Sequence, residues 1–530
     1  GEYPGRADPS LADELPARLA DGRTRARGVH HVRLDYYPDR YTEVADSTQV
    51  RRYFGNAHGL VDKRIEGFGV ETATYDARGL VLSRTDGEEA TTTYERDARG
   101  RVLRVIDPLG RVTACERDAF GLPVRIIDPA GGVTTIHRDA RGNAIEVEDA
   151  TGSATSYERD ARGLVVAIVS PRGALTRITY DAHGNAIERL DANGGAWRWQ
   201  HDALGRVTSI TDPLDAATQY QWSDRGDVIA VTDAAGRASF ASYDDERRLV
   251  ASVDPEGHTT RIIWGGYGRI VAQQQPTGET VRLRYNREGE LVRILNGQGE
   301  AHRLHRNAAG LVVEEQTFDG RRLTYRYDRA GRLTRSQDGA RRRTDRVYNA
   351  AGELVGKCLA DDVVQSFAYD ALGALVRAAW PDGEVVLERD AAGRIVRETQ
   401  ALHGETFAIE HAFDASGDRV RRRTSLGHVE TIERDAMGGR ERTTLDERHV
   451  VEHGRDRLGR ETAARLLHGG RIESAYSAQG ELARRSVLSP TTSSEPDRVM
   501  VDREYRYSRA GDLSDVLDRR LGWVQYEHDA

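Results

Sequence analysis

Aspartates recur at a fixed step along this sequence, and their carboxylates are the groups with the most obvious capacity for chemistry. The first members of the series are Asp76, Asp97, Asp118, Asp139, Asp160, Asp181 and Asp202. Such a ladder could bind calcium only if neighbouring carboxylates came together, since oxygens that share an ion at about 2.4 Å lie within about 5 Å of each other. Copies carried on alternate strands of a sheet are about 9.6 Å apart. We therefore expect these aspartates to form turns rather than a metal site.

Pairs of carboxylates at this spacing could also flank a glycosidic bond in an inverting glycosidase, and aromatic side chains of the same repeat could bind sugar. With 85 acidic residues in the chain, however, such pairs are unavoidable. The aromatic positions, occupied by Tyr94, Tyr157 and Trp199, are filled by Ile178 or Cys115 in other copies. This interchange with aliphatic residues favours a packing role over a saccharide site.

The remaining reactive side chains form no recognisable site. His30 and His31 are adjacent, but the sequence contains no HExxH motif, no histidine pair joined to a CxxC motif and no nucleophile elbow. Cys115 and Cys358 lack the spacing of a zinc site or of a disulfide framework, and Cys115 is expected to be a buried thiol. We therefore assign no catalytic, cofactor-binding or metal-binding residue in the chain.

Two further patterns favour turns and solvated strands over ligand sites. The glycine runs 265–268 and 297–299 resemble phosphate loops only weakly, because neither opens a predicted helix. The arginine runs 341–343 and 421–423 could contact a polyanion, but acidic residues lie near both. The formal net charge of -8 gives no general attraction to nucleic acid or to an anionic membrane.

Composition limits the kind of core that the chain can build. Of its 530 residues only 38% are hydrophobic and 7% aromatic, which is too little to fill several compact cores. The longest unbroken apolar run, 164–169, is far shorter than the roughly 18 residues of a membrane-spanning helix. The chain is therefore expected to expose much surface and to depend on repetition for its stability.

A 21-residue repeat sets the elements that must hold these side chains, with the pattern aromatic or arginine, Asp, two residues, Gly. Its glycines run from Gly79 to Gly373 in fourteen steps, with Arg247 in place of one of them. The step then becomes irregular, and an insertion rich in Ser, Thr and Pro over 489–496 precedes the last copy. These later glycines are Gly393, Gly417, Gly438, Gly459, Gly480 and Gly511. A segment around residue 56 fits one degenerate copy upstream.

A second Asp-x-x-Gly element lies half a period away, as at Asp107–Gly110 and Asp254–Gly257. Asp at the first position of a turn bonds its own backbone, Pro presets the second position and Gly closes the fourth, so both elements predict chain reversals. The residues between them are apolar and often β-branched. A column six residues before each turn glycine, beginning at Tyr94, alternates with the motif aromatic as strands require. Each repeat is therefore predicted to be a β-hairpin.

Hairpins that follow one another in this way can stack only by continuing one antiparallel sheet. Roughly twenty repeats predict about forty strands, and at about 4.8 Å per strand the ribbon is near 190 Å wide, which is too wide for a flat twisted sheet. The ribbon must coil. Because apolar residues are too few to fill both of its faces, the coil is expected to enclose a lumen and to serve as a container.

The Tyr-Asp-x-x-Gly motif, with its Asp-Pro-x-Gly partner at this step, resembles the YD repeats of Rhs proteins over roughly residues 50–530. Well-kept copies are Tyr75-Asp76, Tyr180-Asp181, Tyr243-Asp244, Tyr327-Asp328 and Tyr369-Asp370, and Asn replaces Asp at Asn286, Asn307 and Asn349. The resemblance implies an all-β fold, a β-hairpin solenoid in which one continuous antiparallel sheet is wound into a hollow cocoon. It also implies an N-terminal cap or plug with degenerate strands over 1–50 and a shell over 51–530, regular over 75–373 and looser over 374–530.

For function, the resemblance implies the non-catalytic shell of a bacterial polymorphic toxin, made in the cytoplasm and delivered into competitor cells by a type VI secretion system. The implied partners are an enclosed C-terminal toxin domain, a spike protein with a PAAR tip, a chaperone on the N-terminal segment and an immunity protein. No cofactor, nucleic acid or membrane span is expected. The family's C-terminal core, with its self-cleaving aspartyl-protease-like site, has no counterpart before Ala530. Cleavage residues and toxin are therefore expected outside residues 1–530.

Two alternatives share parts of this interpretation. The chain could be the shell subunit of a Tc-type toxin complex, in which the same kind of hollow shell is loaded by a different component. It could instead be an extracellular adhesion or saccharide-binding YD-repeat protein, which would display its surface and have an empty lumen. The scarcity of cysteine and the predominance of arginine over lysine favour a bacterial toxin shell over the extracellular protein.

Overall fold

The computed structural model describes residues 2–3, 32–37, 41–46, 49–67, 69–466, 469–489 and 498–527. These residues form one antiparallel sheet of 48 strands, in which each strand pairs with the strands before and after it in the sequence. The predicted all-β sheet of hairpins is confirmed, with more strands than the expected forty or so.

The strands are short, and most contain five or six residues. The first twelve are β1 (Glu2–Tyr3), β2 (Val32–Tyr37), β3 (Tyr41–Ala45), β4 (Val50–Gly55), β5 (Val61–Glu66), β6 (Gly69–Tyr75), β7 (Val81–Thr85), β8 (Thr91–Arg96), β9 (Val102–Ile106), β10 (Val112–Arg117), β11 (Pro123–Ile127) and β12 (Val133–Arg138). The next twelve are β13 (Ala144–Glu148), β14 (Ala154–Arg159), β15 (Val165–Val169), β16 (Leu175–Tyr180), β17 (Ala186–Leu190), β18 (Ala196–His201), β19 (Val207–Thr211), β20 (Ala217–Trp222), β21 (Val228–Thr232), β22 (Ala238–Tyr243), β23 (Leu249–Val253) and β24 (Thr259–Trp264).

A 3₁₀ turn, η2 (Gly266–Gly268), follows at one of the glycine runs singled out in the sequence. It leads to β25 (Ile270–Gln274), β26 (Thr280–Tyr285), β27 (Leu291–Leu295), β28 (Ala301–Arg306), β29 (Val312–Gln316), β30 (Arg322–Tyr327), β31 (Leu333–Gln337), β32 (Arg343–Tyr348), β33 (Leu354–Cys358), β34 (Val364–Tyr369), β35 (Leu375–Trp380) and β36 (Gly383–Arg389). The last twelve are β37 (Ile395–Leu402), β38 (Glu405–Phe413), β39 (Arg419–Thr424), β40 (Val429–Arg434), β41 (Arg440–Leu445), β42 (His449–Arg455), β43 (Glu461–Leu466), β44 (Arg471–Tyr476), β45 (Leu482–Leu488), β46 (Val499–Tyr507), β47 (Leu513–Asp518) and β48 (Gly522–Gln525).

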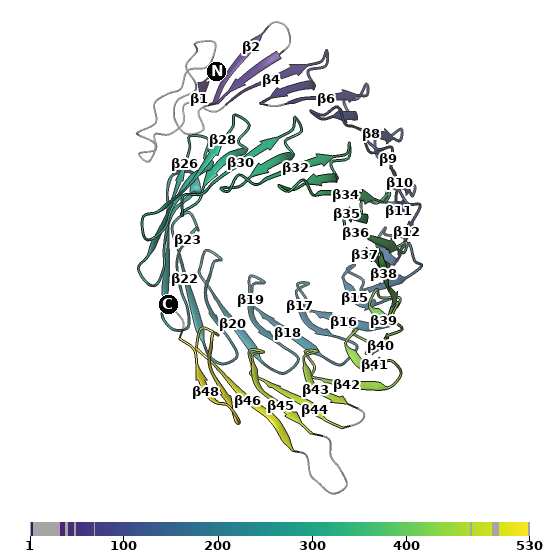
Figure 1. Cartoon of the computed structure of the whole chain (residues 1–530), viewed down its shortest axis with the longest axis vertical. Coiled ribbons are helices and arrows are strands. Elements are labelled where there is room, and N and C mark those ends of the chain that lie inside the picture. The colour runs from purple at the N-terminus through teal and green to yellow at the C-terminus, as the bar shows by residue number, and fades with distance from the viewer. Residues whose placement is uncertain are drawn as a thin grey trace.

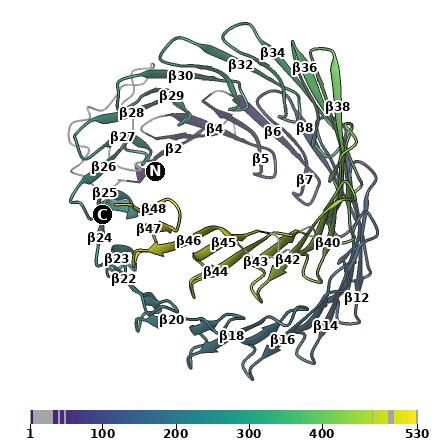
Figure 2. The same cartoon turned by 60° about the horizontal axis from the view of Figure 1, so that its bottom comes forward.

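The ribbon coils around an open centre and passes each side of the ring about twice (Figure 1). Strands β6 to β12 and, a full turn later, β34 to β41 share one side, while β16 to β20 and β42 to β46 share the adjoining one. The tilted view in Figure 2 shows the two coils stacked along the axis of the ring. We refer to the strands up to about β26 as the first coil and to those after it as the second.

The bend of the ribbon is built into each hairpin. A β-bulge shifts the strand register just before the motif residue, as between Thr179 and Tyr180 and between Arg284 and Tyr285. A bulge bends its strand and increases the local twist. Because the bulge recurs at the same place in successive repeats, the small bends add in one direction and curve the sheet.

The described residues do not form a compact core. The accessible surface of the chain is 31231 Å², whereas a compact monomer of 58.8 kDa exposes about 19,000 Å². The buried apolar side chains are Ala45, Ala167, Ala174, Ala230, Ala272, Ile432 and Leu488. The sheet is therefore a single layer with both faces accessible, as expected for a hollow coil.

The single layer corrects one sequence prediction. Cys115 is half-buried rather than buried, since no second layer covers the column in which it lies. Within residues 1–50, β2 and β3 join the sheet, while most of the segment expected to form a cap lies outside the described residues, and the domain division stays a prediction. No helix among the described residues is long and apolar enough to cross a membrane.

Candidate functional site: the seam between the coils and the cleft beside it

The aspartates of the repeat form the turns, as the sequence predicts. Asp181 Oδ1 accepts the backbone N–H groups of His183 at 2.8 Å and of Asn185 at 2.9 Å, and Oδ2 accepts the Asn185 side-chain amide at 2.9 Å. These bonds, led by the Asn185 side chain, lower the pKa of Asp181 to about 2. The carboxylate oxygens thus already have donors, and no group of three or more potential metal ligands occurs among the described residues.

The motif aromatic joins each hairpin to the previous one. The hydroxyl of Tyr180 donates to the carbonyl of Val165 at 2.9 Å, and the indole N–H of Trp222 donates to Val207 at 2.8 Å. In copies with arginine, the guanidinium makes the same bond. Examples of these arginine contacts are Arg96 to Val81, Arg117 to Val102, Arg138 to Pro123, Arg306 to Leu291, Arg434 to Arg419 and Arg455 to Arg440. Tyr, Trp and Arg interchange here because each carries an N–H or O–H donor at the end of a long side chain.

We expect Tyr180→Phe to lower the free energy of unfolding by about 1 kcal/mol, since it removes one neutral hydrogen bond and changes little else. Tyr180→Arg should be close to wild type. Tyr157→Phe is the matched control, because no described residue hydrogen-bonds to that column hydroxyl. Urea unfolding followed by tryptophan fluorescence checks all three, and equal destabilisation by the two Phe variants would rule out the hairpin bond as the cause.

The two kinds of turn lie on opposite edges of the ribbon, which we call the Tyr-Asp edge and the Asp-Pro edge. The Asp-Pro edge of the first coil meets the Tyr-Asp edge of the second. Arg111, beside an Asp-Pro turn, contacts Glu353 at 2.6 Å. These two residues are 242 positions apart in the sequence, and so are Arg172 and Asp414, which are also in contact. One turn of the coil therefore takes about eleven and a half repeats, and the half repeat brings turns of opposite type together.

This contact line, the seam, is made of charged and polar groups. Its contacts are Glu88 with Arg329 at 3.4 Å, Arg111 with Glu353 at 2.6 Å, Arg172 with Asp414 at 2.5 Å and Asp418 at 2.6 Å, Arg237 with Glu481 at 2.9 Å, and Glu256 with the backbone N–H of Arg509 at 2.9 Å. The hydrogen bond that Arg111 donates to Glu353 raises the pKa of the Arg111 guanidinium. Small residues allow close approach elsewhere, as where Gly87 lies against the carbonyl of Arg329.

The residue type at the third position of the Tyr-Asp turns differs between turns that lie in the seam and turns that do not. On the free edge of the first coil this position holds His58, Arg78, Arg99, Phe120, Arg141, Arg162, His183, Leu204, Arg225, Glu246, Tyr267 and Glu288. On the seam edge of the second coil it holds Ala309, Ala330, Ala351, Leu372, Ala392, Ser416, Met437, Leu458, Gln479 and Ala510. Charged and bulky residues are replaced by uncharged and mostly small ones where another coil lies against the turn.

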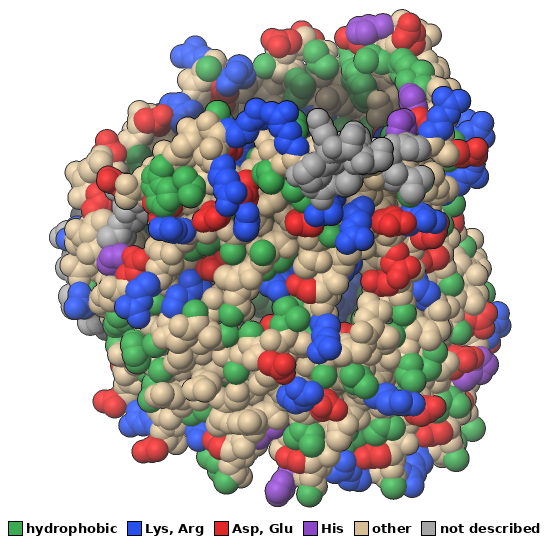
Figure 3. Space-filling model, turned by 90° about the horizontal axis from the view of Figure 1, so that it is seen from below, with side chains coloured by type: hydrophobic (Ala, Val, Ile, Leu, Met, Phe, Trp, Pro, Cys, Tyr) green, Lys and Arg blue, Asp and Glu red, His purple; other side chains and the backbone are tan. Residues whose placement is uncertain are grey.

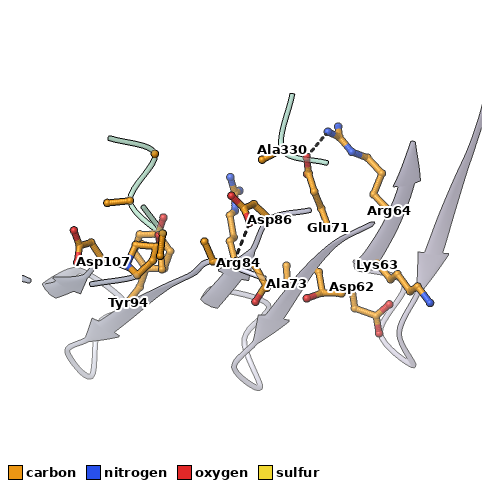
Figure 4. Close-up of a pocket in the computed structure, with 18 of the residues that line it drawn as sticks. Asp62, Lys63, Arg64, Glu71, Ala73, Arg84, Asp86, Tyr94, Asp107 and Ala330 are labelled. Atoms are coloured by element: carbon orange, nitrogen blue, oxygen red, sulfur yellow. Dashed lines mark hydrogen bonds and ion pairs between the residues drawn. The ribbon is translucent and has the colours of Figure 1, made fainter. Parts of the chain in front are cut away.

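A cleft of about 850 Å³ opens beside the seam, between strands β4 to β8 with the turn after β9 on one side and the second-coil turns at Ala330 and 350–352 on the other (Figure 4). Arg64 and Glu71, 3.0 Å apart, stand at one end. Tyr94 and Asp107 stand at the other, with Arg84 between the two ends. The cleft and the seam were not foreseen from the sequence. The change of residue type at the third turn position was the signal that could have located the seam.

The other residues singled out in the sequence do not come together. Arg342 pairs with Asp338 and Arg343 with Asp345, so the first arginine run is largely neutralised. The second run lies along β39, and His30 and His31 lie outside the described residues. The outer surface seen in Figure 3 mixes charges of both signs rather than gathering them.

Asp502 is the most buried carboxylate described, and it is not free to act as an acid. Two bonds of 2.8 Å from Arg484, one of 2.9 Å from Ser486 and an ion pair with Arg519 surround it. The Arg484 bonds lower the pKa of Asp502 to about 2. It is therefore ionised at neutral pH.

The repeat, its turns and the single coiled sheet decide the family. A family model of the RHS repeat matches residues 75–112, 96–135, 138–175, 180–217 and 222–259, and one of the teneurin YD-shell matches residues 265–493. The chain belongs to the Rhs/YD-repeat family. No curated protein matches its sequence.

Solved structures of Tc toxin components have the fold of this Rhs/YD-repeat chain. The Photorhabdus luminescens Tc holotoxin pore, with a mutation in TccC3, is 14% identical with a TM-score of 0.68, over 94% of this chain and 31% of that one. The complex TcdB2-TccC3-Cdc42 is 13% identical with a TM-score of 0.63, over 93% and 32%. TcdB2-TccC3 without its hypervariable C-terminal region is 14% identical with a TM-score of 0.62, over 94% and 31%. The chain thus spans about a third of the solved chains that it matches.

Proposed function

We propose that this chain is the non-catalytic shell of a bacterial secreted toxin or effector and that it encloses a C-terminal cytotoxic domain. The observation that carries the proposal is the hollow two-turn coil, a single layer of sheet that exposes 31231 Å² and surrounds an open centre (Figures 1 and 2). A single layer of sheet without a packed core can form the wall of a container. An enclosed toxin cannot meet its substrate, and a sheet coiled against itself leaves few edges for aggregation.

The absence of an enzymatic role in the shell is part of the proposal. The aspartates that the sequence offers for chemistry are used in turns, as Asp181 illustrates, and the buried Asp502 is held as a carboxylate. Carboxylates held in this way stabilise a wall, and neither Asp181 nor Asp502 is free to act as an acid. Cleavage and toxic activity then belong to segments outside residues 1–530.

The proposal extends to the route of delivery. We propose that the shell is made in the cytoplasm and is delivered to a target cell by a type VI secretion system, with a PAAR-tipped spike, an N-terminal chaperone and an immunity protein as partners. The Tc-type alternative is favoured by one specific observation, the likeness of the fold to the TcdB2-TccC3 structures, with TM-scores of 0.62 and 0.63. In that case a separate subunit would load the shell.

Denaturing intact-mass spectrometry of the native full-length product, purified gently, tests enclosure. We expect a second and smaller polypeptide that copurifies with the shell and separates only after unfolding. Protease added to the native particle should spare this fragment and should digest it after denaturation. A single uncleaved chain that encloses only solvent would contradict the toxin-shell proposal and would favour the surface-binding alternative. Copurification of a spike protein or of a separate loading subunit distinguishes the two delivery routes.

A further inference from the structure

The second coil has a free Asp-Pro edge, and the part of it between β37 and β48, which we call the rim, differs from the Asp-Pro edge in the seam. In the seam the first turn position usually holds Asp, as at Asp107, whose carboxylate accepts the backbone N–H groups of Leu109 at 2.9 Å and Arg111 at 2.8 Å. On the rim this position holds Leu402, Leu445 and Leu466. Leucine cannot accept such bonds, so the turns themselves give no reason for its presence.

The rim carries exposed leucines in turn after turn. The exposed fraction is 44% for Leu402, 71% for Leu426, 42% for Leu445, 50% for Leu466 and 81% for Leu521. The first four belong to successive hairpins, about 9.6 Å apart in the sheet. In Figure 1 the rim follows the ring from its right side to its lower left. Scattered exposed leucines are ordinary, whereas a row of them along one edge marks an interaction surface.

The rim is not built to receive a further coil in the way that the seam does. A seam turn binds the other coil through an arginine in its fifth position, as Arg111 and Arg237 do. On the rim this position holds His428, His449 and Gly470. The free Tyr-Asp edge of the first coil is mostly charged, so a second copy packed head to tail would set those charges against the leucines.

The charges on the rim fit the rim itself. Glu447 and Arg448 are adjacent in the turn that follows Leu445, and no described residue forms an ion pair with either side chain. When the same turn of a second copy lies against this one in the opposite direction, each arginine comes near the glutamate of the other copy. Glu405 and Glu447 also argue against an anionic membrane, which would repel both carboxylates.

The shape of the rim also suits a second copy. Figure 2 shows the coils stacked along the axis of the ring, so the rim rises along this axis as a helical edge. A two-fold rotation about an axis perpendicular to the coil keeps both the hand and the slope of a helix. Two rims related in this way therefore follow each other along their whole length. The contact is isologous and closed, which is the commonest symmetry of soluble homo-oligomers.

We infer that the rim is a homodimer interface, in which two copies of the chain pack rim to rim about a two-fold axis near Leu445. Leu426 of one copy then lies against Leu466 of the other. The pairing covers the leucines and joins the open centres of the two coils end to end. It does not depend on whether a toxin occupies them.

The size of the rim sets the strength of the expected dimer. Ten strand spacings give a length of about 50 Å, and one sheet layer is about 10 Å thick, so each copy buries about 500 Å². The total of about 1,000 Å² is near the lower limit for a specific interface. The dimer should therefore dissociate in the micromolar range.

Sedimentation velocity of the purified chain at increasing micromolar concentrations tests the inference. We expect a monomer–dimer equilibrium, and small-angle scattering should show a dimer elongated along the coil axis. Leu426→Glu together with Leu466→Glu sets like charges against each other in the interface and should weaken association at least about tenfold. Glu447→Arg should also weaken it, and Glu447→Arg combined with Arg448→Glu should restore it, because the exchanged charges again face each other.

Phe120→Glu together with Leu204→Glu is the matched control. These residues are 82% and 76% exposed, but they lie on the free Tyr-Asp edge of the first coil, so association should be unchanged. The inference fails if the chain sediments as a monomer throughout, or if the control weakens association as much as the rim variant. It fails as well if oligomers grow beyond two, as a head-to-tail contact would produce, or if the monomer floats with phosphatidylserine vesicles. Unchanged circular dichroism shows that each variant is folded.

Discussion

Replacement of Arg111, Arg172 and Arg237 together by alanine should part the second coil from the first. Each arginine side chain is less than 20% exposed and joins an Asp-Pro turn to an acidic residue of the other coil. A hydrogen bond to a charged group contributes about 1.5–3 kcal/mol, and truncation also leaves the partner carboxylate in a partly buried place. The three sites are far apart, so their effects should add. No strand pairing crosses the seam among the described residues, so resistance to separation is left to the remaining seam contacts, such as Glu88 with Arg329 and Glu256 with the backbone of Arg509.

Small-angle scattering should show a larger radius of gyration for the triple variant, and hydrogen exchange should rise at the Tyr-Asp turns 349–352, 414–417 and 477–480. The matched control replaces three arginines whose ion pairs lie within one coil, namely Arg104, Arg125 and Arg198. Their side chains are about half exposed, and their loss should have little effect. If the control variant expands as much as the seam variant, the ion pairs between the coils are not what holds them together.

Much of the local structure was predictable because the same turn and strand pattern recurs in every repeat. Asp at the first turn position and Gly at the fourth gave the turns, and the alternation between them gave the strands. Even the exception obeys the rule, since Arg247, which replaces a turn glycine, keeps the left-handed conformation with φ of 63°. Its guanidinium is held by Asp227 at 2.7 Å, which helps to offset a conformation that favours glycine.

The arrangement of the coils was not predictable from the period. The 21-residue step determines the length of each hairpin. The number of hairpins per turn of the coil depends instead on how far each bulge bends its strand, and residue types do not predict that angle. The seam pairs, such as Arg111 with Glu353, are 242 residues apart and belong to no local pattern. The cleft was not predictable either, because Arg84 has no feature in the sequence that distinguishes it from other strand residues, and the cleft forms only where the second coil lies beside it.

The sequence also shows that tyrosine, tryptophan and arginine replace one another in the motif, but it does not show why. Sequence periodicity shows that Tyr180, Trp222 and Arg138 are equivalent, but not that all three donate to a carbonyl of the previous repeat. A shared hydrogen bond explains why such different side chains are accepted. An aliphatic residue has no donor and would leave that carbonyl without its bond.

The second large effect is expected on acidification. Hydrogen bonds from Asn143 and Asn185 hold the pKa of Asp139 and Asp181 below the ordinary value of 3.8, and for Asp181 it falls to about 2. The same direction recurs at other turn aspartates, namely Asp76, Asp97, Asp107, Asp149, Asp160, Asp202, Asp233, Asp244 and Asp254. A carboxyl whose pKa is lower in the folded state stabilises the fold above its unfolded pKa, and this stabilisation is lost as the pH falls through the folded value.

Stability should therefore be nearly constant from neutral pH to about 5 and should fall steeply between about 4 and 2, where many turns are protonated together. Circular dichroism and light scattering across this range measure it. Asp181→Asn keeps the oxygen acceptor, as Asn286 does naturally, and should reduce the loss on acidification because the charge is no longer there to titrate. Asp245→Asn, at a fully exposed side chain, should leave the acid profile unchanged. A profile that is flat to pH 2 would mean that the turn carboxylates stabilise the coil no better than their protonated forms.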